Sequence, residues 1–446
     1  MRAIVLVPVK PTAAGANARA PALARSSSDR LAEAVALAKA IELEIVDAHI
    51  VPLARPRAAT LFGSGKLAEI ADRVSEHEVS LAVVDHQLSA VQQRNLETAW
   101  NCKVLDRTGL ILEIFGARAA TREGTLQVEL AHLTYQKSRL VRTWTHLERQ
   151  RGGFGFLGGP GEAQIETDRR LIEERIEGLR KDLRAVATTR ALHRAGRRRA
   201  PFAVLALVGY TNAGKSTLFN RMTQARVLSA DMLFATLDPT LRAVDLPHGA
   251  RLILSDTVGF ISDLPTMLIA AFRATLEEVI EADVILHVRD VSHDDTEAQL
   301  HDVETILRQL GIDPHGASPN QPTLIEVWNK IDRLDADQRG RLRNLAERRP
   351  AEQRPILVSA ITGEGIDTLN AAIEARLAAG RVLLELVLDA ADGAGVSWLH
   401  RHTEVIHKAI DQESGRTVMT VRADPGKADA VRAKFPESES RIASSE

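Results

Sequence analysis

The chain has 446 residues, which is too long for one compact core and corresponds to about three domains of ordinary size. With 45% hydrophobic and 26% charged residues and a formal net charge of -2, its composition is that of a globular protein, and the net charge identifies no partner. A single cysteine, Cys102, excludes an internal disulfide and a cysteine-rich metal site. The chain has neither a cleavable signal pattern nor a run of about 18 apolar residues, so we expect a cytoplasmic protein.

The first 122 residues predict a flexible segment followed by a small α/β domain. Residues 1–28 contain a short apolar run and then a stretch rich in Ala, Pro, Ser and Arg, so we assign them to a flexible N-terminal segment. Between residues 29 and 122, helical and strand patterns alternate, which predicts a parallel sheet flanked by helices. The expected elements are helices near 31–41, from 66 and at 90–100, and strands near 43–51, 81–85 and 104–106.

Residues 123–200 predict a long helical hairpin. Apolar residues recur at spacings of four and three on both sides of the glycine-rich segment RGGFGFLGGPGE, 151–162, a pattern typical of two packed helices. At about 1.5 Å per residue the first arm would be about 40 Å long, so its tip would project away from the neighbouring domains. The expected contact residues are Leu126, Leu130, Leu133, Leu140, Trp144 and Leu147 in the first arm and Ile165, Ile172, Ile176, Leu179, Leu183 and Val186 in the second.

The same segment is basic. Between Lys137 and Arg199 the chain has 16 Lys and Arg against 8 Asp and Glu, a balance of +8 within a chain of net charge -2. Such a stripe is typical of a surface that binds nucleic acid. The alternative is a solvated helix surface with ion pairs between neighbouring turns.

Residues 201–378 predict a P-loop domain. The sequence GYTNAGKS has the form GxxxxGK[ST] and lies between an apolar strand, 202–208, and a helical stretch. Its glycines allow backbone N–H groups to converge on phosphates, Lys215 would reach the β and γ phosphates, and Ser216 would hold Mg²⁺. We assign nucleotide binding to Gly209, Tyr210, Thr211, Asn212, Ala213, Gly214, Lys215, Ser216 and Thr217.

Two further segments complete a site for the metal and the γ phosphate. The run LILSDTVGF, 252–260, is a strand that ends in DxxG, so Asp256 would bind Mg²⁺ through water and the backbone of Gly259 would contact the γ phosphate. Between this run and the P-loop, FATLDPT, 234–240, predicts a switch loop. Thr236 would complete the Mg²⁺ shell there, with Thr240 as the competing choice.

The motif NKID, 329–332, indicates which nucleotide base the site accepts. It lies at the end of a strand expected at 323–328. The carboxylate of Asp332 would accept hydrogen bonds from N1–H and N2–H₂ of guanine, and adenine would leave that carboxylate unpaired. In LVSAITGEG, 357–365, the N–H of Ala360 would meet guanine O6. The nucleotide is therefore GTP or GDP, with Asn329, Lys330, Asp332, Ser359 and Ala360 around the base.

Catalysis is less well defined by the sequence than binding. Phe260 follows the DxxG motif where the Ras pattern has the Gln that orients water, so the water-orienting group stays unidentified and the catalytic candidates are Asn212, Thr236 and Gly259. Asn212 is similar to a P-loop Asn of bacterial GTPases that helps to hold K⁺ beside the phosphates. Our hypothesis is that K⁺, or a large partner that orders the switch loops, stimulates hydrolysis.

The chain resembles the HflX family of the Obg-HflX group of GTPases from about Asp29 to Arg376. The resemblance is carried by RGGFGFLGGPGEAQIETDRR, 151–170, by KVLDRTGLILEIFGARA, 103–119, and by FATLDPT. It implies that an α/β domain, a helical hairpin and a GTPase domain together bind the large ribosomal subunit and its rRNA. It further implies that the hairpin tip approaches the peptidyl-transferase region and that binding splits stalled ribosomes under stress.

Several alternatives remain at this level. The protein is expected to act as a monomer, and the competing function is a nucleotide-sensing factor for ribosome assembly or anchoring. LFGSGK, 61–66, lacks the first glycine and the final Ser or Thr of a P-loop and predicts a helix start, with weak ATP binding and RNA remodelling as the alternative. Residues 379–446 predict a small α/β domain and a frayed tail, with strands near 382–388 and 416–421 and helices near 396–402 and 427–435.

Overall fold

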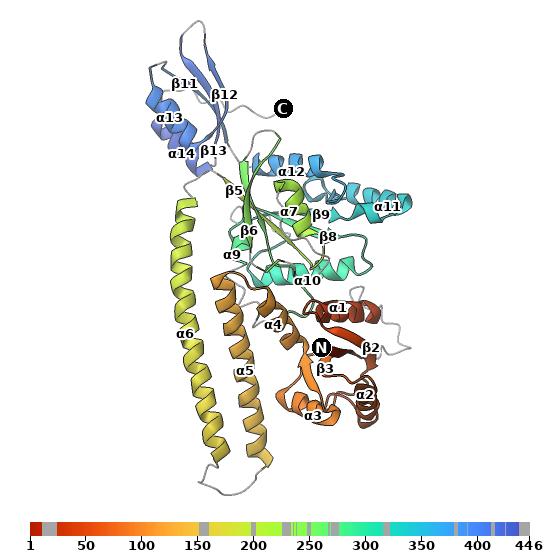
Figure 1. Cartoon of the computed structure of the whole chain (residues 1–446). Helices are drawn as coiled ribbons and strands as arrows, with labels where there is room; N and C mark the ends of the chain where they lie inside the picture. The colour runs from red at the N-terminus through yellow and green to blue at the C-terminus, as the bar shows by residue number, and fades with distance from the viewer. Residues whose placement is uncertain are drawn as a thin grey trace.

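The computed structural model describes residues 1–10, 25–150, 160–197, 202–224, 233–234, 236–237, 239–247, 251–265, 268, 276–314, 322–378, 382–389, 391–411, 415–423 and 425–436. Three sheets and a pair of long helices make up this part of the chain (Figure 1). The arrangement confirms the multidomain α/β class expected from the sequence.

The N-terminal domain is a four-stranded parallel sheet in the order β2-β1-β3-β4. Ser89 caps the third helix with a reciprocal bond to Gln92, as the sequence predicts. The elements are β1 (Arg2–Val9), α1 (Ser27–Lys39), β2 (Glu44–Pro52), α2 (Ser64–Glu76), β3 (Leu81–Val84), α3 (Ala90–Trp100), β4 (Lys103–Asp106) and α4 (Arg107–Arg118).

Strand β1 corrects the prediction that residues 1–28 form a flexible segment. It lies inside the sheet between β2 and β3, and residues 3–7 are fully buried. The run AIVLV is apolar at every position, which is the pattern of a parallel strand covered on both faces. Residues 11–24 lie outside the described residues, and α1 begins at Ser27, where Ser26 accepts a hydrogen bond from the backbone of Asp29.

Two antiparallel helices, α5 (Arg122–Gln150) and α6 (Pro160–Arg197), form the predicted hairpin (Figure 1). In α6 the predicted contact residues Ile176 and Leu179 are buried, and Ile172, Leu183 and Val186 are half-buried. The predicted tip, 151–162, lies mostly outside the described residues, as do the side chains of 141–150.

Helix α5 differs from its predicted single contact stripe. Leu126, Leu130 and Leu133 are only half-buried, whereas Val128 and Ala131 are buried in the core that also contains α4. The reason is that α5 packs against α4 as well as α6, so its apolar surface covers two sides.

The P-loop domain has a six-stranded sheet in the order β10-β9-β8-β5-β7-β6, in which β6 alone among the described strands runs antiparallel to its neighbour. Loops at the carboxyl ends of its parallel strands carry the motifs, which is where α/β sheets bind ligands. The elements are β5 (Ala203–Gly209), α7 (Lys215–Thr223), β6 (Thr240–Asp245), β7 (Arg251–Asp256), α9 (Glu277–Ile280), β8 (Val284–Asp290), α10 (Thr296–Gln309), β9 (Thr323–Asn329), η1 (Ile331–Arg333), α11 (Ala336–Glu347), η2 (Ala351–Gln353), β10 (Ile356–Leu357) and α12 (Ile366–Ala378).

The C-terminal domain is a three-stranded antiparallel sheet in the order β11-β13-β12 with two helices. Its elements are β11 (Val382–Leu388), α13 (Gly393–His402), β12 (Glu404–Ile410), β13 (Thr417–Ala423) and α14 (Pro425–Lys434). The sequence predicted all of these except β12, whose exposed apolar residues Ile406 and Ile410 obscure a one-sided strand pattern. Among the described residues, no helix is long and apolar enough to cross a membrane.

One hydrophobic core joins the N-terminal domain to the P-loop domain. It contains Val5 and Phe115 from the first and Val208, Phe234 and Phe260 from the second. The rings of Phe115 and Phe234 meet edge to face, with 4.8 Å between their centroids and 81° between their planes. The segment that contains Phe234 therefore packs directly on α4.

The packing of the hairpin predicts different effects for two leucines of α6. Leu179 is 1% exposed, so Leu179→Ala should lower the free energy of unfolding of the hairpin by about 2 to 5 kcal/mol. Leu171 is 55% exposed, so Leu171→Ala should change it by no more than about 0.5 kcal/mol. Urea unfolding with hydrogen exchange of the α5 and α6 amides measures both, and equal effects would contradict this packing.

Candidate nucleotide site

The P-loop has the backbone that its glycines predict. Gly214 has φ of 92°, and a Cβ on it would collide with the side-chain amide of Asn329. Gly209 has φ of 152°, and a Cβ there would collide with the carbonyl of Val288. Asn212 takes the left-handed conformation with φ of 61°, which Asn tolerates better than most residues. Close packing and a positive φ therefore require glycine at both Gly209 and Gly214.

Lys215 is buried and folds back over this loop. Its Nζ donates to the carbonyls of Gly209 at 3.2 Å and Tyr210 at 2.8 Å. Burial lowers the pKa of Lys215 to about 8, Asp256 opposes that shift, and Lys330 adds to it. The amine is thus held at the place where the phosphates are expected.

Three oxygen side chains converge beside Lys215. Ser216 Oγ donates to Asp256 Oδ2 at 2.7 Å, and Thr236 Oγ1 lies 2.9 Å from Ser216 Oγ and donates to the same carboxylate oxygen at 2.9 Å. Asp256 is fully buried, its Oδ1 has no hydrogen-bond partner among the described residues, and burial raises its pKa. Hard oxygen donors around an incompletely paired carboxylate fit Mg²⁺. Of the two predicted switch threonines, Thr236 reaches this cluster, whereas Thr240 starts strand β6.

The glycine of DxxG lies against the P-loop. A Cβ on Gly259 would come within 2.8 Å of the Thr211 side chain and 3.0 Å of Lys215 Nζ. The next residue, Phe260, is 2% exposed, and its backbone bonds Gly209 and Thr211, with N to O distances of 3.0 and 2.7 Å. Phe260 therefore packs into the interdomain core and offers no polar group to a water molecule.

The base motifs are tied to the P-loop through Asn329. Its Nδ2 donates to the carbonyl of Ala213 at 2.9 Å, and its Oδ1 accepts from the N–H of Ala360 at 3.0 Å. Asp332 accepts a hydrogen bond from Ser359 Oγ at 2.6 Å. All the residues predicted around the base thus lie on two adjacent loops, and Asn329 joins these loops to the phosphate loop rather than standing free.

Two supporting residues were missed by the sequence reading. Asp290, at the end of β8, pairs with Lys330 Nζ at 2.7 Å, and Arg221 of α7 donates to the carbonyl of Ala360 at 3.1 Å. The available signal for Asp290 was its position as a carboxylate at the carboxyl end of strand β8, where α/β sheets bind ligands. Arg221 has no such signal, because helix position alone does not reveal a contact 139 residues away.

The second glycine-rich stretch has a different geometry. Helix α2 begins at Ser64, with Gly63 as an extended N-cap residue. Neither Gly63 nor Gly65 has a left-handed φ or a close neighbour at its Cβ position. LFGSGK is therefore a helix start, as expected, and lacks the enclosed loop seen at Gly209–Ser216.

The parallel sheet, the glycine loop ahead of α7, the buried Asp256 and the loop that bears NKID define a P-loop protein that binds a guanine nucleotide. Family models match most of the chain: GTP-binding GTPase N-terminal at residues 28–116, GTP-binding GTPase middle region at 118–197, 50S ribosome-binding GTPase at 204–330 and HflX C-terminal domain at 344–442.

Curated relatives agree with these models. A GTPase HflX of Magnetococcus marinus is 52% identical over 86% of this chain and 87% of its own length, and that of Escherichia coli K12 is 46% identical over 82% and 83%. The crystal structure of the complex of SsGBP and GDP aligns with a TM-score of 0.48 and 23% identity, covering 84% of this chain and 98% of that one. The chain belongs to the HflX family, and it is a GTPase that hydrolyses GTP.

The buried amine of Lys215 predicts how nucleotide affinity depends on pH. Phosphates would raise its pKa above the value of about 8 that it has without them, so binding should take up a proton. Affinity for GDP should be constant below pH 8 and should fall above it, by up to about tenfold per pH unit.

Calorimetry from pH 7 to 9 in buffers of different ionisation enthalpy measures both effects. Lys215→Arg is the control, because a guanidinium stays protonated throughout this range and should remove the dependence. An unchanged affinity at pH 9 with no proton uptake in the unaltered protein would contradict the assignment.

Proposed function

We propose that this GTPase binds the large ribosomal subunit and its rRNA through the α5–α6 hairpin and that its GTP cycle separates the subunits of stalled ribosomes under stress. The observation that supports this most is the combination of a nucleotide switch with a long, basic hairpin in one chain. The matched model described as a 50S ribosome-binding GTPase supports the same partner.

The dimensions of the hairpin favour a deep binding site. Its helices have 29 and 38 residues, which corresponds to about 44 and 57 Å. Their free ends lie beyond the N-terminal domain, far from α7 and the nucleotide loops (Figure 1). A projection of this length can reach into a structured RNA while the nucleotide domain stays at its surface.

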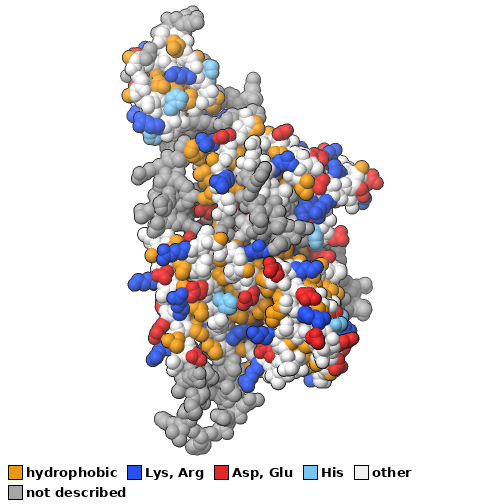
Figure 2. Space-filling view, in the orientation of Figure 1, with side chains coloured by type: hydrophobic (Ala, Val, Ile, Leu, Met, Phe, Trp, Pro, Cys, Tyr) orange, Lys and Arg blue, Asp and Glu red, His pale blue; other side chains and the backbone are white. Residues whose placement is uncertain are grey.

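The charges along the hairpin suit contacts with phosphate. On its described part, basic and acidic side chains alternate (Figure 2). Arg170, Arg175 and Arg180 are exposed, and each forms an ion pair with a glutamate. Exposed pairs of this kind are weak, so phosphates can compete for these guanidinium groups. The excess of eight basic residues between 137 and 199 supplies the remaining attraction.

The nucleotide site would work as follows. Residues 209–217 hold the phosphates, Ser216 and Thr236 bind Mg²⁺ directly, and Asp256 binds it through water. When bound, Mg²⁺ would neutralise charge on the phosphate oxygens during hydrolysis. Asp332 would accept hydrogen bonds from guanine. The N–H of Ala360, which was predicted to meet guanine O6, donates to Asn329 Oδ1 in this structure, so guanine would have to share or displace that bond. The backbone of Gly259 would contact the γ phosphate. Because Thr236 would bind the Mg²⁺ beside it, both switch segments would respond when the γ phosphate is lost.

Catalysis would depend on groups beyond the usual glutamine. Because Phe260 is buried, we propose that a K⁺ ion held by Asn212 supplies positive charge beside the phosphates, or that the ribosome orders the switch segments. We also propose that the protein acts as a monomer in the cytoplasm.

The alternative is a factor that anchors to or assembles ribosomes and uses hydrolysis for release only. The hairpin tip discriminates the two. Replacing residues 151–159 by a Gly-Ser linker of equal length should preserve GTP binding, because the ends of α5 and α6 that the linker joins lie far from α7 (Figure 1). Ribosome-stimulated hydrolysis and subunit separation should both be lost, as measured by phosphate release and by sucrose-gradient profiles. Separation at the unaltered rate would favour the alternative.

The role of Asn212 predicts a dependence on the monovalent cation. Hydrolysis in potassium chloride should exceed that in sodium chloride at the same ionic strength by about tenfold, the size of effect expected for one well-placed charge. Asn212→Ala should remove the difference. Equal rates in both salts, with and without large subunits, would contradict a role for K⁺.

A further inference from the structure

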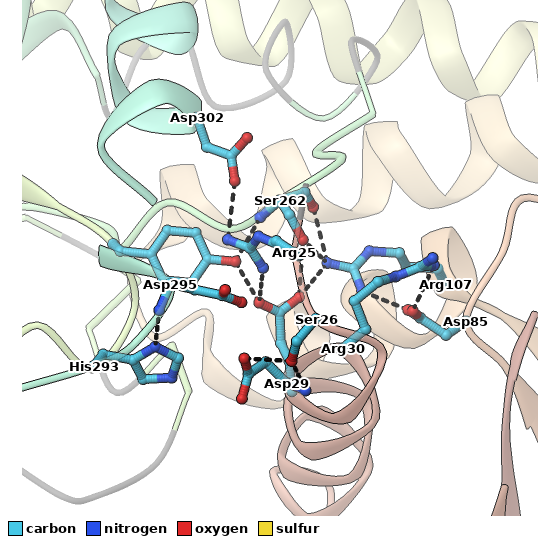
Figure 3. Close-up of polar contacts among 12 residues, drawn as sticks. Arg25, Ser26, Asp29, Arg30, Asp85, Arg107, Ser262, His293, Asp295 and Asp302 are labelled. Atoms are coloured by element: carbon cyan, nitrogen blue, oxygen red, sulfur yellow. Dashed lines mark hydrogen bonds and ion pairs between the residues drawn. The ribbon is translucent and has the colours of Figure 1, made fainter. Parts of the chain in front are cut away.

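A buried polar network connects the N-terminal domain to the nucleotide loops. At its centre is Glu33 of α1, whose side chain is 10% exposed. Arg25, Arg107 and Ser262, which all contact Glu33, lie close together in Figure 3. Its Oε2 accepts hydrogen bonds from Arg25 Nη1 at 2.7 Å and from the hydroxyl of Tyr210. Its Oε1 accepts from Arg107 Nη2 at 2.6 Å and from Ser262 Oγ at 2.9 Å. Two of these donors come from the N-terminal domain and two from the GTPase domain.

The network fixes the backbone of the segment after DxxG. Arg107 Nη2 donates to the carbonyl of Ser262 at 2.8 Å, and the N–H of Ser262 donates to the Tyr210 hydroxyl at 2.8 Å. The backbone N–H, the backbone carbonyl and the side chain of Ser262 are therefore all hydrogen-bonded within the network. Ser262 lies three residues after Gly259, and the intervening Phe260 is bonded to the P-loop backbone. The position of the Gly259 N–H is thus determined partly by the N-terminal domain.

Each charged side chain of the network has a partner of opposite charge without the nucleotide. Burial would raise the pKa of Glu33, but Arg107 and Arg25 outweigh burial and lower it to about 2. Arg107 also pairs with Asp85, and Arg25 with Asp302 at 2.9 Å. Glu33 therefore stays ionised at neutral pH, and a change in the position of Ser262 would leave buried donors without their acceptor.

The same helix contacts both switch segments. Arg107 is the first residue of α4, and Phe115, about two turns later, packs edge-on against Phe234. In the same structure Thr236 lies at the Ser216 and Asp256 cluster, where we propose that it helps to hold Mg²⁺. The contacts from α1 and α4 therefore occur together with the contact of Thr236 with this cluster.

We infer that Glu33 and Arg107 are positioning residues that hold the segment from Gly259 to Ser262 in the arrangement that accepts the γ phosphate. Their hydrogen bonds reach the nucleotide loops through Ser262 and Tyr210, so they act through these two residues. The N-terminal domain thereby sets the preference of the protein for GTP over GDP. This inference rests on the proposed contact of Gly259 with the γ phosphate.

Two variants test the inference through nucleotide preference. Ser262→Ala removes one hydroxyl and leaves every charge of the network in place. Glu33→Gln keeps the shape of the side chain and removes its charge. Each should lower the affinity for a non-hydrolysable GTP analogue by about tenfold, a normal size for coupling between sites, while the affinity for GDP stays within about twofold. Titration with fluorescent nucleotides in the presence of Mg²⁺ measures both affinities in the full-length protein.

Asp302→Asn is the matched control. Asp302 of α10 binds the same Arg25, but among the described residues it forms no hydrogen bond with Ser262 or Tyr210. This variant therefore removes a carboxylate from the network without releasing the switch segment. Its ratio of the two affinities should equal that of the unaltered protein.

Three results would overturn the inference. The ratio of the affinity for the GTP analogue to the affinity for GDP could stay unchanged in Ser262→Ala and Glu33→Gln. This ratio could instead rise in favour of the GTP analogue, or Asp302→Asn could lower it as much as the two test variants do. A parallel loss of GDP affinity in both variants would likewise show general damage instead of positioning. The assay contains no ribosomes, so its outcome is independent of the proposed role in subunit separation.

Discussion

The contact between the N-terminal domain and the GTPase domain is the constraint on which the other features depend. A shared core that contains Phe115, Phe234 and Phe260 brings the two domains together, and the buried carboxylate of Glu33 fixes their polar groups. Since both proposed switch segments lie at this contact, any movement of these segments with the nucleotide would alter an interdomain surface and not only a local loop.

The hairpin is connected to the same contact. Asp106 caps α4 and accepts hydrogen bonds from Tyr135 at 2.5 Å and Arg139 at 2.6 Å, and both of these residues belong to α5. The next residue along the chain, Arg107, reaches the switch segment. The start of α4 is thus held from one side by the hairpin and from the other by the nucleotide loops. This gives a physical basis for a nucleotide switch and an RNA-binding arm within one chain, as proposed for this HflX family member.

Local patterns were sufficient for much of this architecture. The P-loop, the DxxG glycine and Asn329 act through short backbone geometries that their residue types dictate, and the structure brings these segments together. The role of Asn329 in joining loops could not be predicted, because its partners Ala213 and Ala360 contribute backbone atoms that any sequence would supply. The opening apolar run is strand-like in sequence, but it was assigned with residues 1–28 to a flexible segment because a long stretch of linker-like composition follows it. Glu33 and Arg107 belong to no sequence motif. They matter because of a tertiary contact with Ser262, which lies at least 155 residues further along the chain.

The central claim is that the nucleotide state controls attachment to the large ribosomal subunit. Cosedimentation of the protein with purified large subunits, in GDP and in a non-hydrolysable GTP analogue, measures this directly. Binding in the analogue, with little or none in GDP, is the predicted result. Equal binding in both nucleotides, or in neither, would contradict the claim.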